Sequence, residues 1–145
     1  MGVDNRSPPD DAAAWRRPWP PPGEMTFTTS ELPEVRRFTA GWASQAGMSA
    51  DSAADFVIAV SEIATNAVRY GLPPTGLRLQ ATGRTVTAEI RDNGCWRPGT
   101  PPVPWNRGGA GYGGLGLRIA YQVCEDVRIR TGGDGTAVVL RMALT

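Results

Sequence analysis

Apolar residues recur at intervals of three or four positions along the first half of the chain, a spacing typical of one face of an α-helix. The first such set is Leu32, Val35, Phe38, Trp42 and Ala46. Ser30 precedes this set as a candidate N-cap, and Gly47 follows it as a candidate stop. The pattern therefore predicts a helix between Ser30 and Gly47.

A second helix is predicted to begin at Ser49 or Asp51. It should end at Tyr70, because Gly71 and two prolines follow shortly after. The apolar positions of this segment are Phe56, Ala59, Val60, Ile63 and Ala67.

In several other segments, apolar and polar residues alternate, as they do in half-buried strands. Residues 77–81 and 86–90 alternate on either side of Gly83 and Arg84, which predicts an antiparallel hairpin. Further strands are predicted over residues 25–29, 126–131 and 136–142, the last two joined by the turn sequence GGDG. Residues 94–114 contain seven glycines and four prolines without periodicity, which is typical of a lid, a binding loop or disorder. A third helix is predicted over residues 114–124.

The helices and the antiparallel strands are segregated along the chain rather than strictly alternating. The expected class is therefore α+β: a two-layer sandwich with a mixed, mostly antiparallel sheet and three helices on one face. A length of 145 residues with 41% apolar content fits one domain, which we place at residues 24–145. Residues 1–23 hold six prolines and are predicted to form a disordered tail. Its Trp15 and Trp19 indicate either a docking motif or no role at all.

Charge is nearly balanced, with 15 basic and 14 acidic residues. This balance argues against nucleic acid as a direct partner, because phosphate-backbone binding usually requires a basic stripe. The chain has no apolar run long enough to span a membrane, and its N-terminus lacks an apolar signal core. We therefore expect a cytoplasmic protein that does not bind membranes.

The chain contains no histidine and no lysine, since all 15 basic residues are arginines. Serine–histidine and cysteine–histidine nucleophile pairs, histidine-ligated metals and a phosphohistidine within this chain are thereby excluded. A P-loop is excluded as well, because it requires a lysine. Acid–base chemistry is left to carboxylates, tyrosine and cysteine.

Three polar residues of the second helix share one face. Glu62, Asn66 and Arg69 are four and three positions apart, so they are stacked over two turns. An amide oxygen is a suitable ligand for Mg²⁺ beside nucleotide phosphates, and a carboxylate one turn earlier can orient or deprotonate a hydroxyl. The alternative is that the three side chains form the solvated face of the helix.

Two later segments also carry candidate chemistry. Asp92 has the parity of Val86, Ala88 and Ile90, so its carboxylate is predicted to face the buried side, where it needs a donor such as an exocyclic amine. The alternative there is a simple Asp-Asn-Gly turn. The sequence GAGYGGLGL precedes and opens the third helix, where glycine backbone favours phosphate binding. The alternative is a flexible linker.

In this order, the motifs resemble those of the GHKL ATPase superfamily, whose nucleotide-binding domain has the Bergerat fold. ExxxN from Glu62 resembles the N box, DNG from Asp92 the first glycine box, GYGGLGL the second, and GT at Gly135 the closing motif. The resemblance covers about residues 25–142. The chain looks most like the bacterial anti-sigma-factor serine/threonine kinases. NAVRYG also resembles the N box of sensor histidine kinases, but the chain has no histidine to phosphorylate.

The resemblance implies ATP and Mg²⁺ as cofactors. Asn66 would bind the Mg²⁺, and Glu62 would be the catalytic base or would position the acceptor hydroxyl. Asp92 would accept a hydrogen bond from the adenine amine. The other nucleotide-binding positions would be Arg69, Tyr70, Gly94, Gly111, Gly113, Gly114, Leu115, Gly116 and Thr136.

The implied function is ATP-dependent phosphorylation of a serine or threonine on an anti-anti-sigma-type protein, combined with sequestration of a sigma factor. The resemblance also suggests a homodimer. Trp96 departs from the family pattern, because the first glycine box usually has a second glycine at this position, and the loop that follows is rich in proline. These two features favour an alternative, a non-catalytic, nucleotide-dependent partner-binding module. A third alternative is a structural domain without a ligand.

Overall fold

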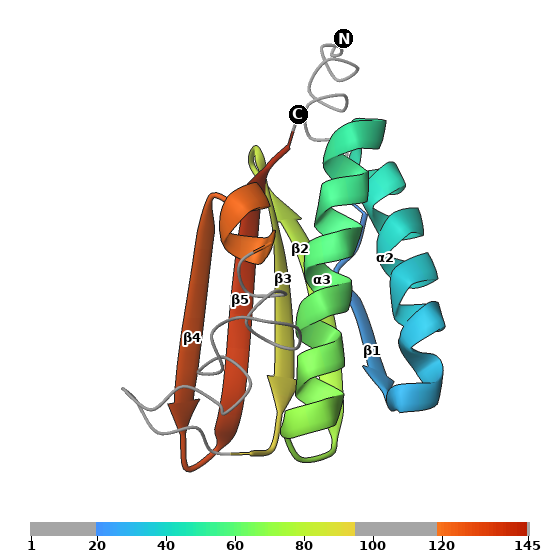
Figure 1. The fold of residues 1–145 in the computed structure, drawn as a ribbon. Helices are drawn as coiled ribbons and strands as arrows, with labels where there is room; N and C mark the ends of the chain where they lie inside the picture. Colours follow the sequence, from blue (N-terminus) through green and yellow to red (C-terminus); the bar gives the residue numbers. More distant parts are fainter. Residues whose placement is uncertain (1–19, 95–118, 145) are drawn as a thin grey trace, which may run out of the picture.

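The structure is a computed structural model that describes residues 20–94 and 119–144. The elements, in chain order, are β1 (Gly23–Phe27), the 3₁₀ turn η1 (Thr29–Glu31), α2 (Leu32–Ala46), α3 (Ala50–Tyr70), β2 (Thr75–Thr82), β3 (Thr85–Asp92), β4 (Asp126–Gly132) and β5 (Gly135–Ala143). Residues 119–123 are also helical. The strands form a sheet, and the helices lie on one face of it (Figure 1).

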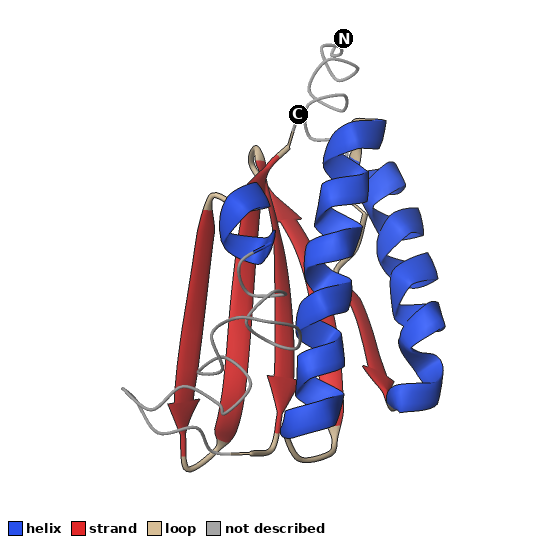
Figure 2. Cartoon of the chain, viewed as in Figure 1, coloured by secondary structure: helices blue, strands red, loops and turns tan. Residues whose placement is uncertain are grey.

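The described strands form one five-stranded sheet in the order β1-β2-β3-β5-β4. This two-layer α+β architecture confirms the predicted fold class (Figure 2). The predicted sheet was mixed and mostly antiparallel. Every pairing among the described strands is antiparallel. The reason is the β4–β5 hairpin, which inserts β5 between β4 and β3 so that β5 runs opposite to both neighbours.

Helix α2 begins differently from the prediction. Ser30 is not its N-cap, because Thr29–Glu31 form a 3₁₀ turn whose capping residue is Thr28. The backbone N–H of Thr28 donates to Glu31 Oε1 at 2.9 Å, and the N–H of Glu31 donates to the Thr28 carbonyl at 2.9 Å. The first of these bonds is the glutamate half of a capping box, and the second closes the 3₁₀ turn. This turn ends the preceding strand at Phe27, two residues before the predicted position.

The other helix boundaries agree with the sequence prediction. Helix α2 ends at Gly47, which has the left-handed conformation with φ of 93°. Helix α3 is capped by Ser49, whose side chain accepts a hydrogen bond from the backbone N–H of Ser52 at 3.2 Å. It ends at Tyr70, followed by Gly71 as the C-cap.

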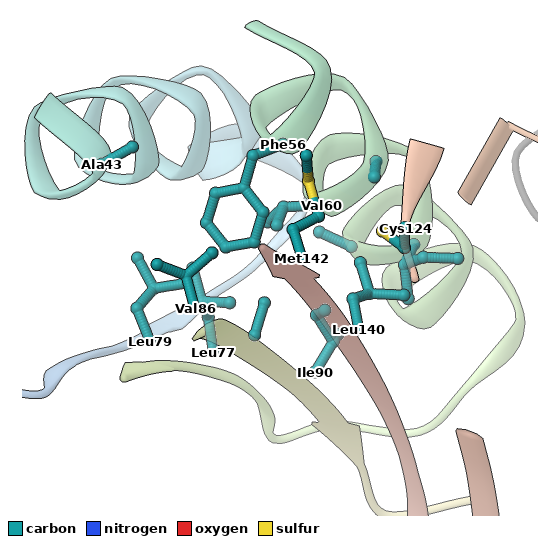
Figure 3. Packing of buried hydrophobic residues seen from close by; sticks show 14 of the residues in the cluster. Ala43, Phe56, Val60, Leu77, Leu79, Val86, Ile90, Cys124, Leu140 and Met142 are labelled. Carbon is teal, nitrogen blue, oxygen red and sulfur yellow. The ribbon is translucent and has the colours of Figure 1, made fainter. Parts of the chain in front are cut away.

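The hydrophobic core lies between the helices and the sheet. Figure 3 shows Phe56 and Val60 of α3 close to Leu79, Val86 and Leu140 of the strands, and all five side chains are fully buried. In β2 and β3 buried residues alternate with more exposed ones. This period-two pattern is the one from which the sequence predicted the hairpin.

The turn of that hairpin lies at Gly83 and Arg84, as predicted. Strand β4 ends one residue later than predicted, at Gly132. Strand β5 is one residue longer than predicted at each end and spans Gly135–Ala143. Most of the predicted tail, the glycine-rich segment from residue 95, and the first half of the predicted third helix lie outside the described residues.

Candidate functional site

The polar column of α3 lies on the flank of the helix that faces away from α2. Ser61 marks the α2 side, because its hydroxyl accepts a hydrogen bond from Arg36 Nη1 of α2 at 3.4 Å. At about 100° per residue, positions 62, 66 and 69 are turned roughly 80–140° from Ser61. Figure 1 shows β5 and β4 on that side of α3. The column is therefore directed toward the part of the sheet that α2 does not cover.

The column is not simply a solvated helix face. Glu62 and Asn66 are half-buried, and only Arg69, in the last turn, is exposed. The Nδ2 atom of Asn66 is buried and has no hydrogen-bond partner in the described part of the structure. Because an unsatisfied buried amide costs about 1–3 kcal/mol, such a group in a native protein usually has a function or an unseen partner.

Asp92 connects the end of β3 to the end of α3. Its Oδ1 accepts hydrogen bonds from the backbone N–H of Gly94 at 2.6 Å and of Leu72 at 3.3 Å. The first bond closes the Asp-Asn-Gly turn that the sequence offered as an alternative. The second shows that the carboxylate also faces the C-terminal end of α3, on the helix-covered side predicted from its parity. The turn and the inward direction of the carboxylate therefore occur together in the same residue.

A second hydrogen bond joins the same two segments. The N–H of Asn93 donates to the carbonyl of Leu72 at 2.7 Å, while the N–H of Leu72 donates to the Asp92 carboxylate. The segment that follows the end of α3 is thus hydrogen-bonded to the end of β3.

Three glycines surround Asp92 closely enough to exclude any side chain. A Cβ on Gly71 would lie 2.5 and 2.6 Å from the two carboxylate oxygens of Asp92, and one on Gly94 would lie 2.9 Å from Oδ1. A Cβ on Gly135 would overlap the Asp92 carbonyl oxygen, and Gly135 also has a positive φ of 115°. The carboxylate is thus held in a pocket of backbone atoms.

Thr136 completes this group from the neighbouring strand. It is the register partner of Asp92 across β3 and β5. Its hydroxyl donates to the carbonyl of Gly94 at 3.0 Å and lies 3.1 Å from the hydroxyl of Thr131. The structure therefore brings together three of the predicted site residues, Asp92, Gly94 and Thr136.

Two residues at this junction were missed as site residues in the sequence. Gly71 was assigned only as a helix stop, and Leu72 was not singled out. The backbone of Gly71, with φ of −94°, is open to any residue, so its glycine is required by space and not by conformation. Only the position of Asp92 in three dimensions reveals that requirement.

For the remaining predicted site residues, the structure gives less information. Tyr70 is 41% exposed at the end of α3. Gly111, Gly113, Gly114, Leu115 and Gly116, together with Trp96, lie outside the described residues.

Cysteine chemistry is disfavoured at the described thiol. Burial, followed by the nearby charge of Asp55, raises the pKa of Cys124 from 9.0 to about 11. The thiol therefore stays protonated near neutral pH, whereas a nucleophilic cysteine needs a lowered pKa.

The described residues contain no group of three or more histidine, cysteine or acidic side chains that could hold a metal ion. A divalent cation at α3 would therefore take few ligands from the described side chains, and the others from water and from the oxygens of its substrate. Asn66 could supply such a ligand through Oδ1, while its buried Nδ2, which lacks an acceptor within the described ranges, could donate to an oxygen of the same substrate. Mg²⁺ commonly binds with few protein ligands beside substrate phosphates.

A family model described as a histidine kinase-like ATPase domain matches residues 25–142. The chain belongs to this family. Membership in the histidine kinase-like ATPase family implies that the domain binds ATP. None of the helices in the described ranges is both long enough and apolar enough to cross a membrane.

Solved structures of other proteins have a similar fold. This histidine kinase-like ATPase domain is similar to the RsbU and RsbW domains of Rv1364c from Mycobacterium tuberculosis, with 25% identity and a TM-score of 0.65. The match covers 86% of this chain but only 32% of the other, so this chain spans about a third of that protein's length.

Two histidine kinases are more distant. The domain of the blue-light activated histidine kinase from Erythrobacter litoralis is 20% identical, with a TM-score of 0.53 over 76% of this chain and 61% of its own. The mycobacterial sensor histidine kinase MprB is 18% identical, with a TM-score of 0.50 over 83% of this chain and 96% of its own. At these identities the similarity supports the fold alone.

Proposed function

We propose that this domain binds Mg-ATP between the α3 column and Asp92 and phosphorylates a serine or threonine of an anti-anti-sigma-type protein. In the same proposal it sequesters a sigma factor. The observation that carries the nucleotide site is the buried Asn66 amide, one turn after Glu62, on the helix whose end is bonded to Asp92. The partner class follows from the motif resemblance to the anti-sigma-factor kinases.

The proposal gives the described residues distinct roles. Asn66 would hold the Mg²⁺, and Arg69 and Tyr70 would lie beside the nucleotide. Asp92 would accept the adenine amine at Oδ2, because Oδ1 already accepts two backbone N–H groups. The Thr136 hydroxyl, bonded to the Gly94 carbonyl, would support the back of the adenine site. Gly111, Gly113, Gly114, Leu115 and Gly116 would bind the phosphates.

The proposed chemistry is a phosphoryl transfer. The hydroxyl oxygen of the acceptor forms a bond to the γ-phosphorus, the bond to the β-phosphate oxygen breaks, and ADP leaves. Glu62 would accept the hydroxyl proton or fix the hydroxyl in line. Bound Mg²⁺ supplies neutralisation of the phosphate charge, and the remaining catalytic effect is positioning.

Nucleotide binding is tested by the thermal unfolding temperature with and without Mg-ATP, since a ligand bound only by the folded state raises it. We expect a clear rise for the natural chain, most of which is lost in Asn66→Ala. Gln45→Ala, which removes an exposed amide from α2, is the matched control and should keep the full rise. An equal rise in Asn66→Ala would contradict the metal-binding role.

Catalysis is tested by transfer of labelled phosphate from ATP to a co-purifying partner protein. Glu62→Ala and Glu62→Gln should bind Mg-ATP normally and transfer little phosphate, since both lack the proton-accepting carboxylate. Normal transfer in both would remove Glu62 from the mechanism. ATP binding by the natural chain without any transfer would instead favour the non-catalytic binding module.

A further inference from the structure

The face of the sheet opposite the helices carries a dense group of charged residues. Figures 1 and 2 show α2 and α3 on one side only, so the other side of the described sheet is uncovered. The outward positions of β2 to β5 include five exposed arginines: Arg78, Arg91, Arg128, Arg130 and Arg141. Their acidic neighbours on this face are Glu24, Glu89 and Asp126. We call this surface the open sheet face.

Three of the five arginines are paired. Arg78 bonds to Glu24 at 3.1 Å, Arg128 to Asp126 at 2.8 Å, and Arg130 to Glu89 at 3.3 Å. Arg91 and Arg141 have no acidic partner among the described residues. The open sheet face therefore has two arginines outside the ion pairs of the described residues, and the acid Asp134 also lies at its edge, where it lines one hollow.

Arg91 also stands between two hollows. Its register partners are Gly76 on β2 and Ala137 on β5, so the side chains next to it are a hydrogen atom and a methyl group. The hollow over Gly76 has a volume of about 400 Å³, and the one over Ala137 has about 390 Å³. Both are lined by Arg91 and Glu89.

The composition of this face indicates which kind of partner could bind to it. Its apolar side chains near the centre are small, Ala137 and Val139, whereas stable dimer interfaces are mostly apolar. Its carboxylates are interspersed with the arginines, which disfavours a continuous polyanion such as nucleic acid. Separate acidic side chains, placed against individual arginines, suit it better.

The size of the face agrees with a segment rather than a whole domain. Five strands about 4.8 Å apart and about seven residues long give roughly 550 Å². A standard protein–protein interface buries about 800 Å² on each partner. A single extended or helical segment, about 10 Å wide, would cover the strip of this face that runs past Arg91 and Arg141.

We propose that the open sheet face binds an acidic segment of a partner protein, with carboxylates placed against Arg91 and Arg141 and neighbouring side chains entering the two hollows. Ala137 and Arg141 are four positions apart on β5, which is about 13 Å along the strand. Acidic residues about four positions apart in an extended segment match that distance. One of the two hollows is also lined by Thr136, so the surface adjoins the proposed nucleotide site. The inference itself rests on Arg91 and Arg141, which have no role in the proposed function.

The test uses the full chain and a fluorescent synthetic peptide of alternating glutamate and threonine, with binding followed by anisotropy. The same peptide with glutamine for glutamate is the ligand control. We expect only the acidic peptide to bind. In NMR spectra of the protein, its addition should shift the amide resonances of residues around Gly76 and Ala137. Arg91→Gln and Arg141→Gln should each weaken binding by about tenfold, as expected for loss of a charged contact.

Arg37→Gln is the matched protein control, because it removes the same charge from an exposed site on α2 in the other layer. It should leave peptide binding unchanged, and all three variants should keep the natural unfolding temperature. Equal weakening in Arg37→Gln, or no preference for the glutamate peptide, would overturn the proposal. Tighter, Arg91-dependent binding of single-stranded DNA or phosphatidylserine vesicles would also overturn it.

Discussion

At Gly71 the absence of a Cβ atom allows helix α3 and strand β3 to meet. The two carboxylate oxygens of Asp92 occupy the space that an alanine side chain would need. The parity of Asp92 was readable from the alternation of β3, and the shared face of Glu62 and Asn66 from their helical spacing of four positions. The burial of the Asn66 amide and the spatial need for Gly71 were not, because both depend on neighbours distant in sequence.

Gly71→Ala should therefore displace Asp92 and lower the free energy of unfolding by about 1–3 kcal/mol, the usual cost of overpacking. It should also reduce the rise in unfolding temperature with Mg-ATP, because Asp92 would lose its contact with Leu72. Gly132→Ala is the control, since a Cβ there meets nothing within 4 Å. Denaturation of both variants measures the difference. Equal stabilities would show that the junction adapts at little cost.

At the scale of the element, a helix ends where local sequence rules predict when only one nearby residue can serve as the cap or stop. Gly47 acts as the predicted stop, and α3 begins at Ala50, between the two predicted starting positions, with Ser49 as its cap. Ser30 does not act as a cap, because Glu31 reaches back to the N–H of Thr28 and forms a 3₁₀ turn that includes Ser30. Two acceptable capping residues stood close together, and only the geometry of the turn decided between them.

The two glycines of the α2 segment should respond to alanine in opposite directions. Gly41 lies inside the helix with open space around it, so Gly41→Ala should stabilise the protein by about 0.5–1 kcal/mol. Gly47 has φ of 93°, so Gly47→Ala should destabilise it by about 1–2 kcal/mol. Chemical denaturation of the pair provides its own internal control. A change of the same sign in both would contradict the assigned helix end.

At the scale of the whole molecule, one layer of helices and one sheet enclose the core. Phe56 of α3 is fully buried in it, whereas Ile58, two positions along, is 46% exposed. The difference is the helical period, which turns neighbouring positions to opposite sides.

Phe56→Ala should lower the free energy of unfolding by about 3–5 kcal/mol, the range for removing a large buried side chain. Ile58→Ala should lower it by less than about 1 kcal/mol, because much of this side chain already contacts water. Equilibrium urea unfolding of the two variants gives both values. Similar losses would mean that α3 does not pack on the sheet through the Phe56 side.

The sequence by itself determined the helices, the two hairpins, the α+β class and the motif order, because these follow from local spacing and from residue types that short-range physics constrains. Tertiary structure decided the order of the strands, the fully antiparallel pairing of the described sheet and the meeting of Gly71, Leu72, Asp92 and Thr136. It also decided which arginines of the open sheet face are left unpaired in the described ranges. These features depend on contacts between residues far apart in the chain, and such contacts leave no periodic trace in the sequence.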